Sequence, residues 1–450
     1  MGVHTDQSST ALAPPLWQQL QACAQALQAV LQGRNHSQAL ALVDVRLRPA
    51  AQALLFAVLR HWGRTLAVKK LLVQRQPSAP VQALLCTGLA LLLPTAPQMY
   101  PSHTLVSQLV EAAKRHPATK AQAAFVNACL RRFLREQTSL MAETDAVPSA
   151  RWNFPQWWID LVRQDHPAHW QSILAASQQA APMAVRVNQR QISRDDLLAQ
   201  WQAQGLQADV AGDHGLVLHQ AKPVHAIPGF EQGWWSVQDL GAQWAAPVLL
   251  KDLKPHDGHR LKLLDACAAP GGKTAHLLEM ADADVLALDI DAQRCQRIEE
   301  NMQRLQLKAR VLAADAAKPN DWWDGQLFDG ILLDAPCTAS GIVRRHPDIP
   351  WLRRAADVAG LAAQQKTLLH ALWPLLAPGG RMLYCTCSLF ASEGRDQVQA
   401  FLANNTQARR LASVGPFLPG VAAKAETVAD NHDSDHDGFF YALLERRLDV

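Results

Sequence analysis

The arrangement of hydrophobic and polar residues divides the chain into regions of different character. Residues 14–140 are rich in Ala, Leu and Gln, and apolar residues return there at three- and four-residue intervals, which predicts an entirely helical region. The polar, proline-containing stretch 141–150 is typical of a linker. After it come a tryptophan-rich helix, a short strand at 183–188, a helix that opens at the capping pair Ser193 and Asp196, and two more strand-like pieces. This middle region is expected to be a small α+β module.

From about residue 236 onward, short apolar runs alternate with helical patterns. Strands are predicted over 261–266, 284–290, 328–336 and 380–388. Strands that alternate with helices predict a parallel, doubly wound sheet. Ligands of such sheets bind beyond the carboxyl ends of the strands. The residues that directly follow these strands are therefore the ones expected to carry chemistry.

Length and composition fit three folded domains. The chain has 450 residues, of which 49% are hydrophobic and 18% charged, and this balance excludes a disordered or collagen-like chain. The expected division is a helical domain over 1–148, the small α+β module over 149–240, and a Rossmann-like α/β domain over 241–450. The formal net charge of +3 indicates no partner by itself.

No targeting or membrane segment is expected. The first twenty residues contain no Lys or Arg and no apolar stretch, unlike a secretory signal. The longest apolar run, 83–93, is about half the ~20 residues that a membrane span needs. The eight cysteines follow no disulfide-scaffold spacing, so a cytoplasmic protein with reduced thiols is expected.

A glycine-rich turn, CAAPGGKT over 267–274, follows the first strand of the sheet and opens a helix. Such a turn directs backbone N–H groups and the helix N-terminus at a negative or polar cofactor group. A nucleotide-binding P-loop fits Gly272, Lys273 and Thr274, but its first glycine would fall on Cys267. An adenosine-containing cofactor instead requires an acidic residue about 20 residues further on, at the end of the next strand. Asp289 stands there, so the nucleoside-cofactor interpretation is favoured.

Asp315 lies at the end of the following candidate strand, in VLAADAA. In this position it is expected to reach an adenine amino group, although a helix-capping aspartate would look the same in sequence.

Two further motifs place thiols at strand ends. LLDAPC ends at Cys337, and YCTCS contains Cys385 and Cys387. Most cysteines are small buried hydrophobes, which is our interpretation of Cys23, Cys86 and Cys129. No histidine is spaced to complete a zinc site, and the reducing compartment disfavours a disulfide. The interpretation that remains for Cys337, Cys385 and Cys387 is thiolate chemistry in a crevice that both strand ends face.

Taken together and in this order, CAAPGGKT, LLDAPCTASG, RRHPDIPW and TCS resemble the RNA 5-methylcytosine methyltransferases, and most of all the bacterial 16S rRNA (cytosine-5) methyltransferases of the RsmB/Sun type. The resemblance covers nearly the whole chain. The helical start resembles a NusB-like RNA-binding domain, down to FVNACLRRFLRE over 125–136. The middle resembles the family's RNA-recognition-like module, with VRVN and GWWSVQD, and the last part resembles its methyltransferase domain, which closes with DGFFYALL.

The resemblance implies S-adenosylmethionine as cofactor and a covalent mechanism at cytosine. A thiolate that adds to C6 of the base makes C5 nucleophilic enough to accept a methyl group. The family uses the cysteine of Thr-Cys-Ser for attack, here Cys387, and the cysteine after Asp-Ala-Pro, here Cys337, for release. Asp334 is expected to hydrogen-bond the base beside the cofactor, and Lys273 to touch either of them. The cofactor-binding residues expected from the resemblance are Cys267, Ala268, Ala269, Pro270, Gly271, Gly272, Lys273, Asp289, Asp315 and Asp334.

The sequence departs from the family pattern in two ways. Cys385 adds a thiol two residues before the expected nucleophile, on the same face of a strand, where it could substitute for that residue or oxidise with it. The helix after the nucleophile begins ASEGRDQ, where the family more often has a Glu-Asn pair.

Charged residues gather in three segments. Between Glu111 and Glu136 six cations face two glutamates, a net of +4 that suits either a solvated helix face or a phosphate-binding patch: Lys114, Arg115, Lys120, Arg131, Arg132 and Arg135. The segment 344–354 carries four arginines against Asp348 and is expected to line an RNA channel, with Trp351 as a stacking surface for a base. An acidic stretch before the last strand resembles a solvated insertion: Glu426, Asp430, Asp433, Asp435 and Asp437.

The sequence thus favours a methyltransferase that acts on C5 of one cytosine in 16S rRNA, as naked RNA or within a small-subunit assembly intermediate. It is expected to be a monomer that uses no metal and no membrane. Two alternatives stay open: a non-catalytic RNA-binding or antitermination factor with a decayed enzyme domain, and a P-loop ATPase.

Overall fold

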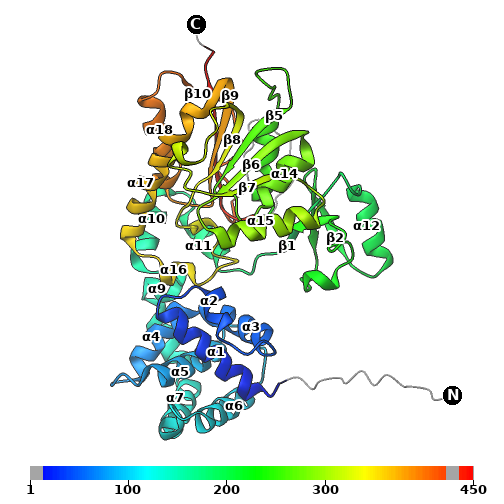
Figure 1. Cartoon of the computed structure of the whole chain (residues 1–450). Helices are drawn as coiled ribbons and strands as arrows, with labels where there is room; N and C mark the ends of the chain where they lie inside the picture. The colour runs from blue at the N-terminus through cyan, green and yellow to red at the C-terminus, as the bar shows by residue number, and fades with distance from the viewer. Residues whose placement is uncertain (1–13, 422–434, 449–450) are drawn as a thin grey trace, which may run out of the picture. The chain divides into compact units, whose positions relative to one another are not determined.

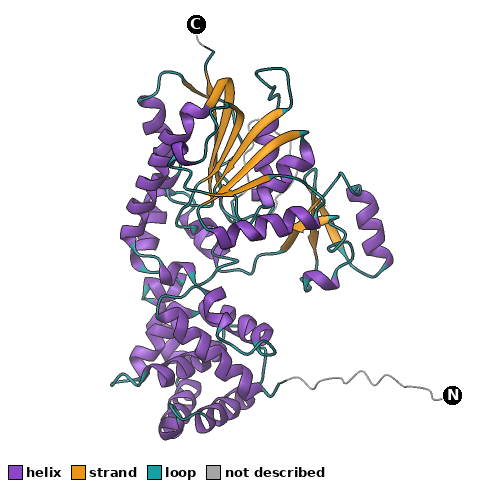
Figure 2. Cartoon of the chain, viewed as in Figure 1, coloured by secondary structure: helices purple, strands orange, loops and turns teal. Residues whose placement is uncertain are grey.

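The computed structural model describes residues 14–421 and 435–448. The chain forms two compact units. The first comprises the residues up to Ile159 together with the later segment His346–Leu352, and the second comprises Asp160–Arg345 and the residues from Arg353 onward. The first unit is helical, and all strands lie in the second (Figures 1 and 2). No helix of the described residues has the length and apolar character to cross a membrane.

The first unit confirms the predicted all-helical region. Its core is built mainly from small and branched apolar side chains of α1, α3, α5, α6 and α7. The helix α5 begins with a proline near its N-terminus, where the missing N–H is not needed, and is buried over most of its length. The helices of this unit are α1 (Leu16–Leu31), α2 (His36–Ala41), α3 (Arg48–Leu59), α4 (Trp62–Leu72), α5 (Ala79–Leu92), α6 (Ser102–Arg115), α7 (Ala123–Arg135), α8 (Gln137–Asp145), α9 (Pro148–Trp152) and α16 (Ile349–Leu352).

The stretch 141–150, expected to be a linker, is mostly helical instead and packs on α4. It forms the end of α8 and the start of α9. Arg64 of α4 donates to the carbonyl of Met141 and to the Thr144 hydroxyl, and the Asn153 side chain accepts from Gly63 N–H at 2.7 Å. The prediction was wrong because these bonds to a helix some 80 residues earlier satisfy the polar groups that suggested a solvated linker.

The middle of the chain confirms the small α+β module. Two helices, α10 (Gln156–Asp165) and α11 (Trp170–Ser177), precede an antiparallel sheet in the order β2-β3-β1-β4. The strands are β1 (Met183–Val187), β2 (Ala208–Ala211), β3 (Gly215–Leu218) and β4 (Trp235–Val237). The predicted cap is present, since Asp196 N–H donates to Ser193 Oγ at the start of α12 (Arg194–Ala203). Trp201 of this helix meets Trp235 edge to face in the module's core.

The last part confirms the doubly wound α/β domain. Its sheet has seven strands in the order β10-β11-β9-β8-β5-β6-β7. The five strands from β9 to β7 are parallel, and β11 and β10 are added antiparallel at one edge. The strands are β5 (Leu261–Ala266), β6 (Ala283–Asp289), β7 (Arg310–Ala313), β8 (Phe328–Asp334), β9 (Leu376–Thr386), β10 (Ala408–Arg410) and β11 (Phe440–Arg446).

Helices cover both faces of this sheet. One core contains residues of α13 (Ala245–Leu250), α14 (Gly272–Met280) and α15 (Ala292–Arg304), and the other contains residues of α17 (Ala355–Leu372) and α18 (Arg395–Ala403). The chain runs outward from β5 through β6 to β7 and then returns to place β8 on the other side of β5. Ligands of such sheets bind at the reversal, which here falls at the carboxyl ends of β5 and β8.

Candidate active site

The glycine-rich turn has the backbone conformation that a cofactor cradle requires. Cys267 has φ +68° and Gly271 φ +93°, both left-handed. A Cβ on Gly271 would lie 3.1–3.4 Å from Ile298 of α15, in addition to the strain of positive φ, so glycine is needed there. Gly272 then begins α14, and the free N–H groups of its first turn lie at the end of β5. Burial raises the pKa of the Cys267 thiol to about 12, which disfavours its thiolate form at neutral pH.

The two aspartates expected at the cofactor occupy the next strand ends. Asp289 is the last residue of β6, is 3% exposed, and accepts a hydrogen bond from Ala269 N–H at 3.2 Å. Its carboxylate also pairs with Arg294 of α15 at 3.2 Å. Asp315 lies two residues after β7, accepts from Ala317 N–H at 3.0 Å, and is 3.7 Å from Lys318. Asp289 thus ties the glycine-rich turn to the neighbouring strand, and Asp315 stabilises a turn.

Lys273 and Asp334 join the turn after β5 to the end of β8. Lys273 Nζ donates to Asp334 Oδ2 at 2.5 Å. Burial alone would lower the pKa of Lys273, but the Asp334 carboxylate outweighs it, and the pKa is raised. The other oxygen of Asp334 accepts from Cys385 Sγ at 3.5 Å. Lys273 was expected to touch either the base or the cofactor. It is held on the Asp334 carboxylate, which is itself expected to contact the base beside the cofactor.

The sulfurs of Cys337 and Cys387 lie 3.5 Å apart, in the crevice where the sequence placed them. Cys337 follows β8 and Cys387 follows β9, so the two parallel strands carry them to the same edge. Contact with Cys387 and burial raise the pKa of Cys337 well above its usual value. The protonated form of Cys337 is therefore favoured, and its sulfur lies in hydrogen-bond contact with that of Cys387.

The extra thiol, Cys385, points to the same face of the sheet but has a different environment. It is fully buried, and burial together with the Asp334 carboxylate raises its pKa well above the usual value. Its proton is directed at Asp334, whereas Cys387 is only partly buried. The structure therefore favours Cys387 over Cys385 as the sulfur that reacts.

Arg344 and Arg345 do not form the open basic surface expected of the 344–354 segment, whereas Arg354 is exposed. Arg344 is 2% exposed, and its guanidinium bonds Asp435 and Asp437. Arg345 pairs with Asp437 at 2.6 Å and with Asp239 at 2.7 Å. The RNA-channel prediction is wrong for these two residues because carboxylates neutralise them. Arg353 bonds the carbonyls of Cys337 and Thr338 instead, and so fixes the loop that carries the first thiol.

The same bonds overturn the prediction of a solvated acidic insertion for Asp437, whereas Asp435 is 63% exposed. Asp437 is fully buried, and burial raises its pKa to about 6. Glu426, Asp430 and Asp433 lie outside the described residues. Trp351, expected to stack on a base, packs against the core of the helical unit, and its Nε1 atom is buried. The predictions for Asp437 and Trp351 failed because formal charge and aromatic character do not indicate burial.

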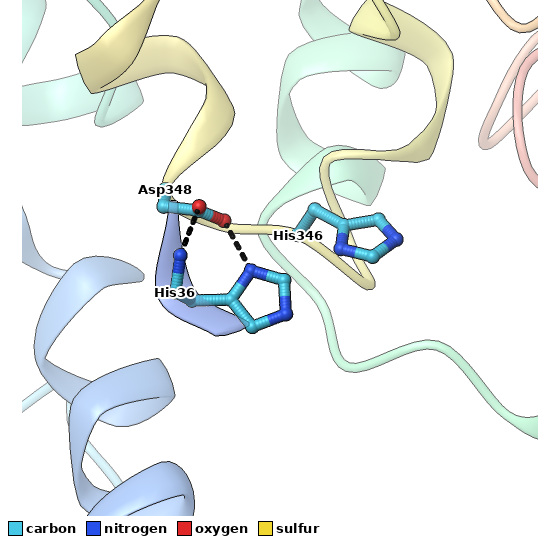
Figure 3. A group of neighbouring side chains, drawn as sticks. All are labelled: His36, His346 and Asp348. Carbon is cyan, nitrogen blue, oxygen red and sulfur yellow. Dashed lines mark hydrogen bonds and ion pairs between the residues drawn. The ribbon is translucent and has the colours of Figure 1, made fainter. Parts of the chain in front are cut away.

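A cluster in the helical unit offers potential metal ligands. His36, His346 and Asp348 each present a ligand atom within 4.8 Å of the others (Figure 3). Asp348, however, accepts from His36 N–H at 2.8 Å and bonds His36 Nδ1 at 3.0 Å. Burial alone would raise the pKa of Asp348, but these bonds outweigh it and lower the pKa. The cluster is explained as an anchor that fastens the 346–352 segment to α2.

Three contacts around the site have no obvious signal in the sequence. Arg186 of β1 bonds the Gly272 carbonyl at the start of α14, Gly341 N–H donates to the Cys387 carbonyl, and the buried Glu393 bonds Thr338 and Ser388. For one of the three, the sequence offers a local signal: the carboxylate of Glu393 stands in the largely apolar stretch that follows Ser388.

The residues of this crevice suit an adenosine-containing methyl donor. The first turn of α14 offers N–H groups, and Asp289, Asp315 and Asp334 offer carboxylates at three successive strand ends. The fold and the crevice define a Rossmann-like methyltransferase, for which S-adenosylmethionine is the cofactor, joined to a NusB-like helical unit.

Comparison with known proteins identifies the family. The chain matches the family described as 16S rRNA methyltransferase RsmB/F over residues 250–445, the ferredoxin-like domain of the same proteins over 154–225, and the NusB family over 18–135. It is 38% identical to ribosomal RNA small subunit methyltransferase B of Vibrio cholerae, over 92% of this chain and 94% of that protein. Its identity to the protein of the same name from Salmonella newport is 39%, over 93% and 96% of the two chains.

The crystal structure of PH0851 has the same fold, with a TM-score of 0.77 and 23% identity over 97% of this chain and 100% of that one. The chain belongs to the RsmB/F family of 16S rRNA methyltransferases. The domain boundaries at 148 and 240, the monomeric state and the cytoplasmic location stay predictions.

Proposed function

We propose that this protein methylates C5 of a cytosine in 16S rRNA through a covalent bond between Cys387 and C6 of the base. The observation that carries the proposal is the pair of sulfurs 3.5 Å apart at the carboxyl ends of β8 and β9. Family membership and the rRNA methyltransferase names of its relatives support the substrate. When bound, S-adenosylmethionine supplies an electrophilic methyl group.

The two cysteines divide the chemistry. Burial and contact with Cys387 raise the pKa of Cys337, so the attacking role is assigned to Cys387, as the family resemblance implies. It adds to C6, and the electron pair of the C5–C6 double bond makes C5 the nucleophile that takes the methyl group. The C5 proton then passes to water, its electron pair restores the double bond, and the C6–S bond breaks toward Cys387. The Cys337 S–H donates to the departing sulfur and so assists release.

Lys273 and Asp334 position the base. Lys273 Nζ lies 2.5 Å from Asp334 Oδ2 and orients this carboxylate at the end of β8. A carboxylate there accepts from the exocyclic amine of cytosine, the group that distinguishes cytosine from uracil. The base must leave its stack to reach Cys387, as bases do in enzymes of this chemistry.

The rRNA contact is supported by a groove of about 690 Å³ between α6 and α7. Lys114, Asn127 and Arg131 line it. Two other cations of the region are already paired, Arg115 with Glu111 and Arg132 with Glu136. Of the cations in this region, Lys114 and Arg131 are the two that line the groove.

Labelled S-adenosylmethionine and undermethylated small-subunit rRNA test the activity. Label in 5-methylcytosine is expected. Its absence would remove the proposal and favour the non-catalytic RNA-binding factor, and hydrolysis of ATP would favour the P-loop ATPase.

The division of roles has its own test. Cys337→Ala should accumulate an RNA adduct that survives denaturant, and Cys387→Ala should form none. The reverse pattern would exchange the two roles. Cys295→Ala, a cysteine on α15, is the matched control and should behave as the unmodified protein.

A further inference from the structure

Glu393 lies at the end of a short 3-10 turn between β9 and α18, and its side chain is fully buried. It follows the Thr-Cys-Ser motif by five residues, and its charge is one of the causes that raise the pKa of Cys337. Burial raises the pKa of its carboxyl, and hydrogen bonds from Ser388 and Thr338 oppose that effect. A buried carboxylate is costly unless its oxygens are well satisfied, so its partners indicate what it is for.

Those partners come from both cysteine loops. Glu393 Oε1 accepts from Thr338 N–H at 2.8 Å, and Oε2 accepts from Thr338 Oγ at 2.5 Å. Oε2 also accepts from Ser388 Oγ at 2.6 Å. Thr338 directly follows Cys337, and Ser388 directly follows Cys387. One carboxylate therefore holds the residue next to each thiol.

Other bonds also join the two loops, and Gly341 N–H donates to the Cys387 carbonyl at 2.9 Å. The hydroxyls of Thr338 and Ser388 are 3.4 Å apart, too long for a strong direct bond. Ser340, three residues after Cys337, contacts Ser388 Oγ at 3.0 Å and accepts from Leu389 N–H. Gln365 of α17 supports the arrangement, because its amide donates to the Pro336 carbonyl at 2.9 Å and to Glu393 at 3.3 Å.

We propose that Glu393 is a positioning residue: its carboxylate sets the separation of the Cys337 and Cys387 sulfurs and thereby the rate at which the covalent RNA adduct is released. The inference rests on the proposed function for its kinetic part, whereas the separation of the sulfurs is a property of the free protein.

Glu393→Asp is the sharpest perturbation. It keeps the charge but withdraws the carboxylate by about 1.5 Å, one C–C bond, so that it no longer reaches both loops. A misplacement of about 1 Å at a reacting group can cost about 10²-fold in rate. Release of the adduct should therefore slow by about that factor, while the KM for S-adenosylmethionine and for RNA stays unchanged. Glu393→Gln keeps the length of the side chain and one acceptor oxygen, so it should release the adduct faster than Glu393→Asp but more slowly than the unmodified protein.

The separation of the sulfurs is measured without RNA or cofactor. Dibromobimane bridges two neighbouring thiols and becomes fluorescent, and mass spectrometry of peptides identifies the pair. The unmodified protein should yield the bridge between Cys337 and Cys387, and in Glu393→Asp its formation should slow by about tenfold or more. Asp396→Asn is the matched control, since this nearby carboxylate is 52% exposed and pairs only with its neighbour Arg395.

An unchanged bridging rate together with unchanged adduct release in Glu393→Asp would overturn the inference. If Glu393→Asp fails to fold, Ser388→Ala removes one arm of the contact and should slow bridging by itself, and a normal rate in that variant would be equally decisive. Failure of the proposed function is distinguishable, because the unmodified protein would then produce no 5-methylcytosine whatever the bridging rates are.

Discussion

Replacing Arg186 with methionine should lower the free energy of unfolding of the second unit by about 3–5 kcal/mol. The side chains of Arg186 on β1 and Glu279 on α14 are 0% and 5% exposed and form two parallel bonds of 2.8 Å. The same guanidinium donates to the Gly272 carbonyl at 2.9 Å and to the Gln238 side chain. Its removal leaves the Glu279 carboxylate buried without a cation, and this uncompensated charge is the main cost.

The magnitude can be checked by unfolding. For a unit of about 280 residues, about 1 kcal/mol shifts Tm by about 1.7 °C, so Arg186→Met should lower Tm by about 5–8 °C. The double variant Arg186→Met with Glu279→Met should recover most of the loss, because it removes the buried charge as well as its partner. The assay is urea and thermal unfolding of the full chain, followed by tryptophan fluorescence.

A surface pair provides the control. Arg260 and Asp282 are 53% and 75% exposed, so Arg260→Met should cost less than about 1 kcal/mol. A double variant that is no more stable than Arg186→Met would refute the reasoning, because the loss would then come from packing or from the Gly272 bond rather than from the unpaired carboxylate.

Two further predictions concern pH and RNA. Burial raises the pKa of Asp265 from 3.8 to about 7, so its contribution to stability is complete below pH 3.8 and is lost as the pH rises through 7. Asp265→Asn should remove this loss of about 4 kcal/mol. The difference in Tm between the variant and the unmodified protein should therefore favour the variant more near pH ~8 than near pH ~5. Equal Tm differences at both pH values would show that the buried Asp265 carboxyl is not the cause. For RNA, Lys114→Gln combined with Arg131→Gln should lower the slope of log K against log salt by about 1.4 for a single-stranded target, roughly 0.7 for each phosphate contact. Arg46→Gln, whose cation already pairs with Asp44, should leave the slope unchanged, and a double variant with the slope of the unmodified protein would exclude the α6–α7 groove as an RNA contact.

Local patterns in the sequence determined the elements and the place of the site. Three- and four-residue periodicity predicted the helices of the first unit, and short apolar runs predicted β5, β6, β8 and β9, because both signals depend on neighbours within a few residues. Parallel strands bring their carboxyl ends to one edge, so the positions of Asp289, Asp334 and the two cysteines after their strands were enough to place them together.

Only the tertiary structure decides whether a charged side chain is exposed or is paired with a residue distant in sequence. The sequence predicted that Arg344 and Arg345 face RNA. In the structure, both are neutralised by Asp437, which lies some 90 residues later in the chain. The 3.5 Å between the Cys337 and Cys387 sulfurs depends on two strands and on Glu393, which joins loops about 50 residues apart in sequence. Periodicity determines which face of an element is buried, but the partner of a polar group is chosen by packing, because a buried charge is tolerated only where distant residues satisfy it.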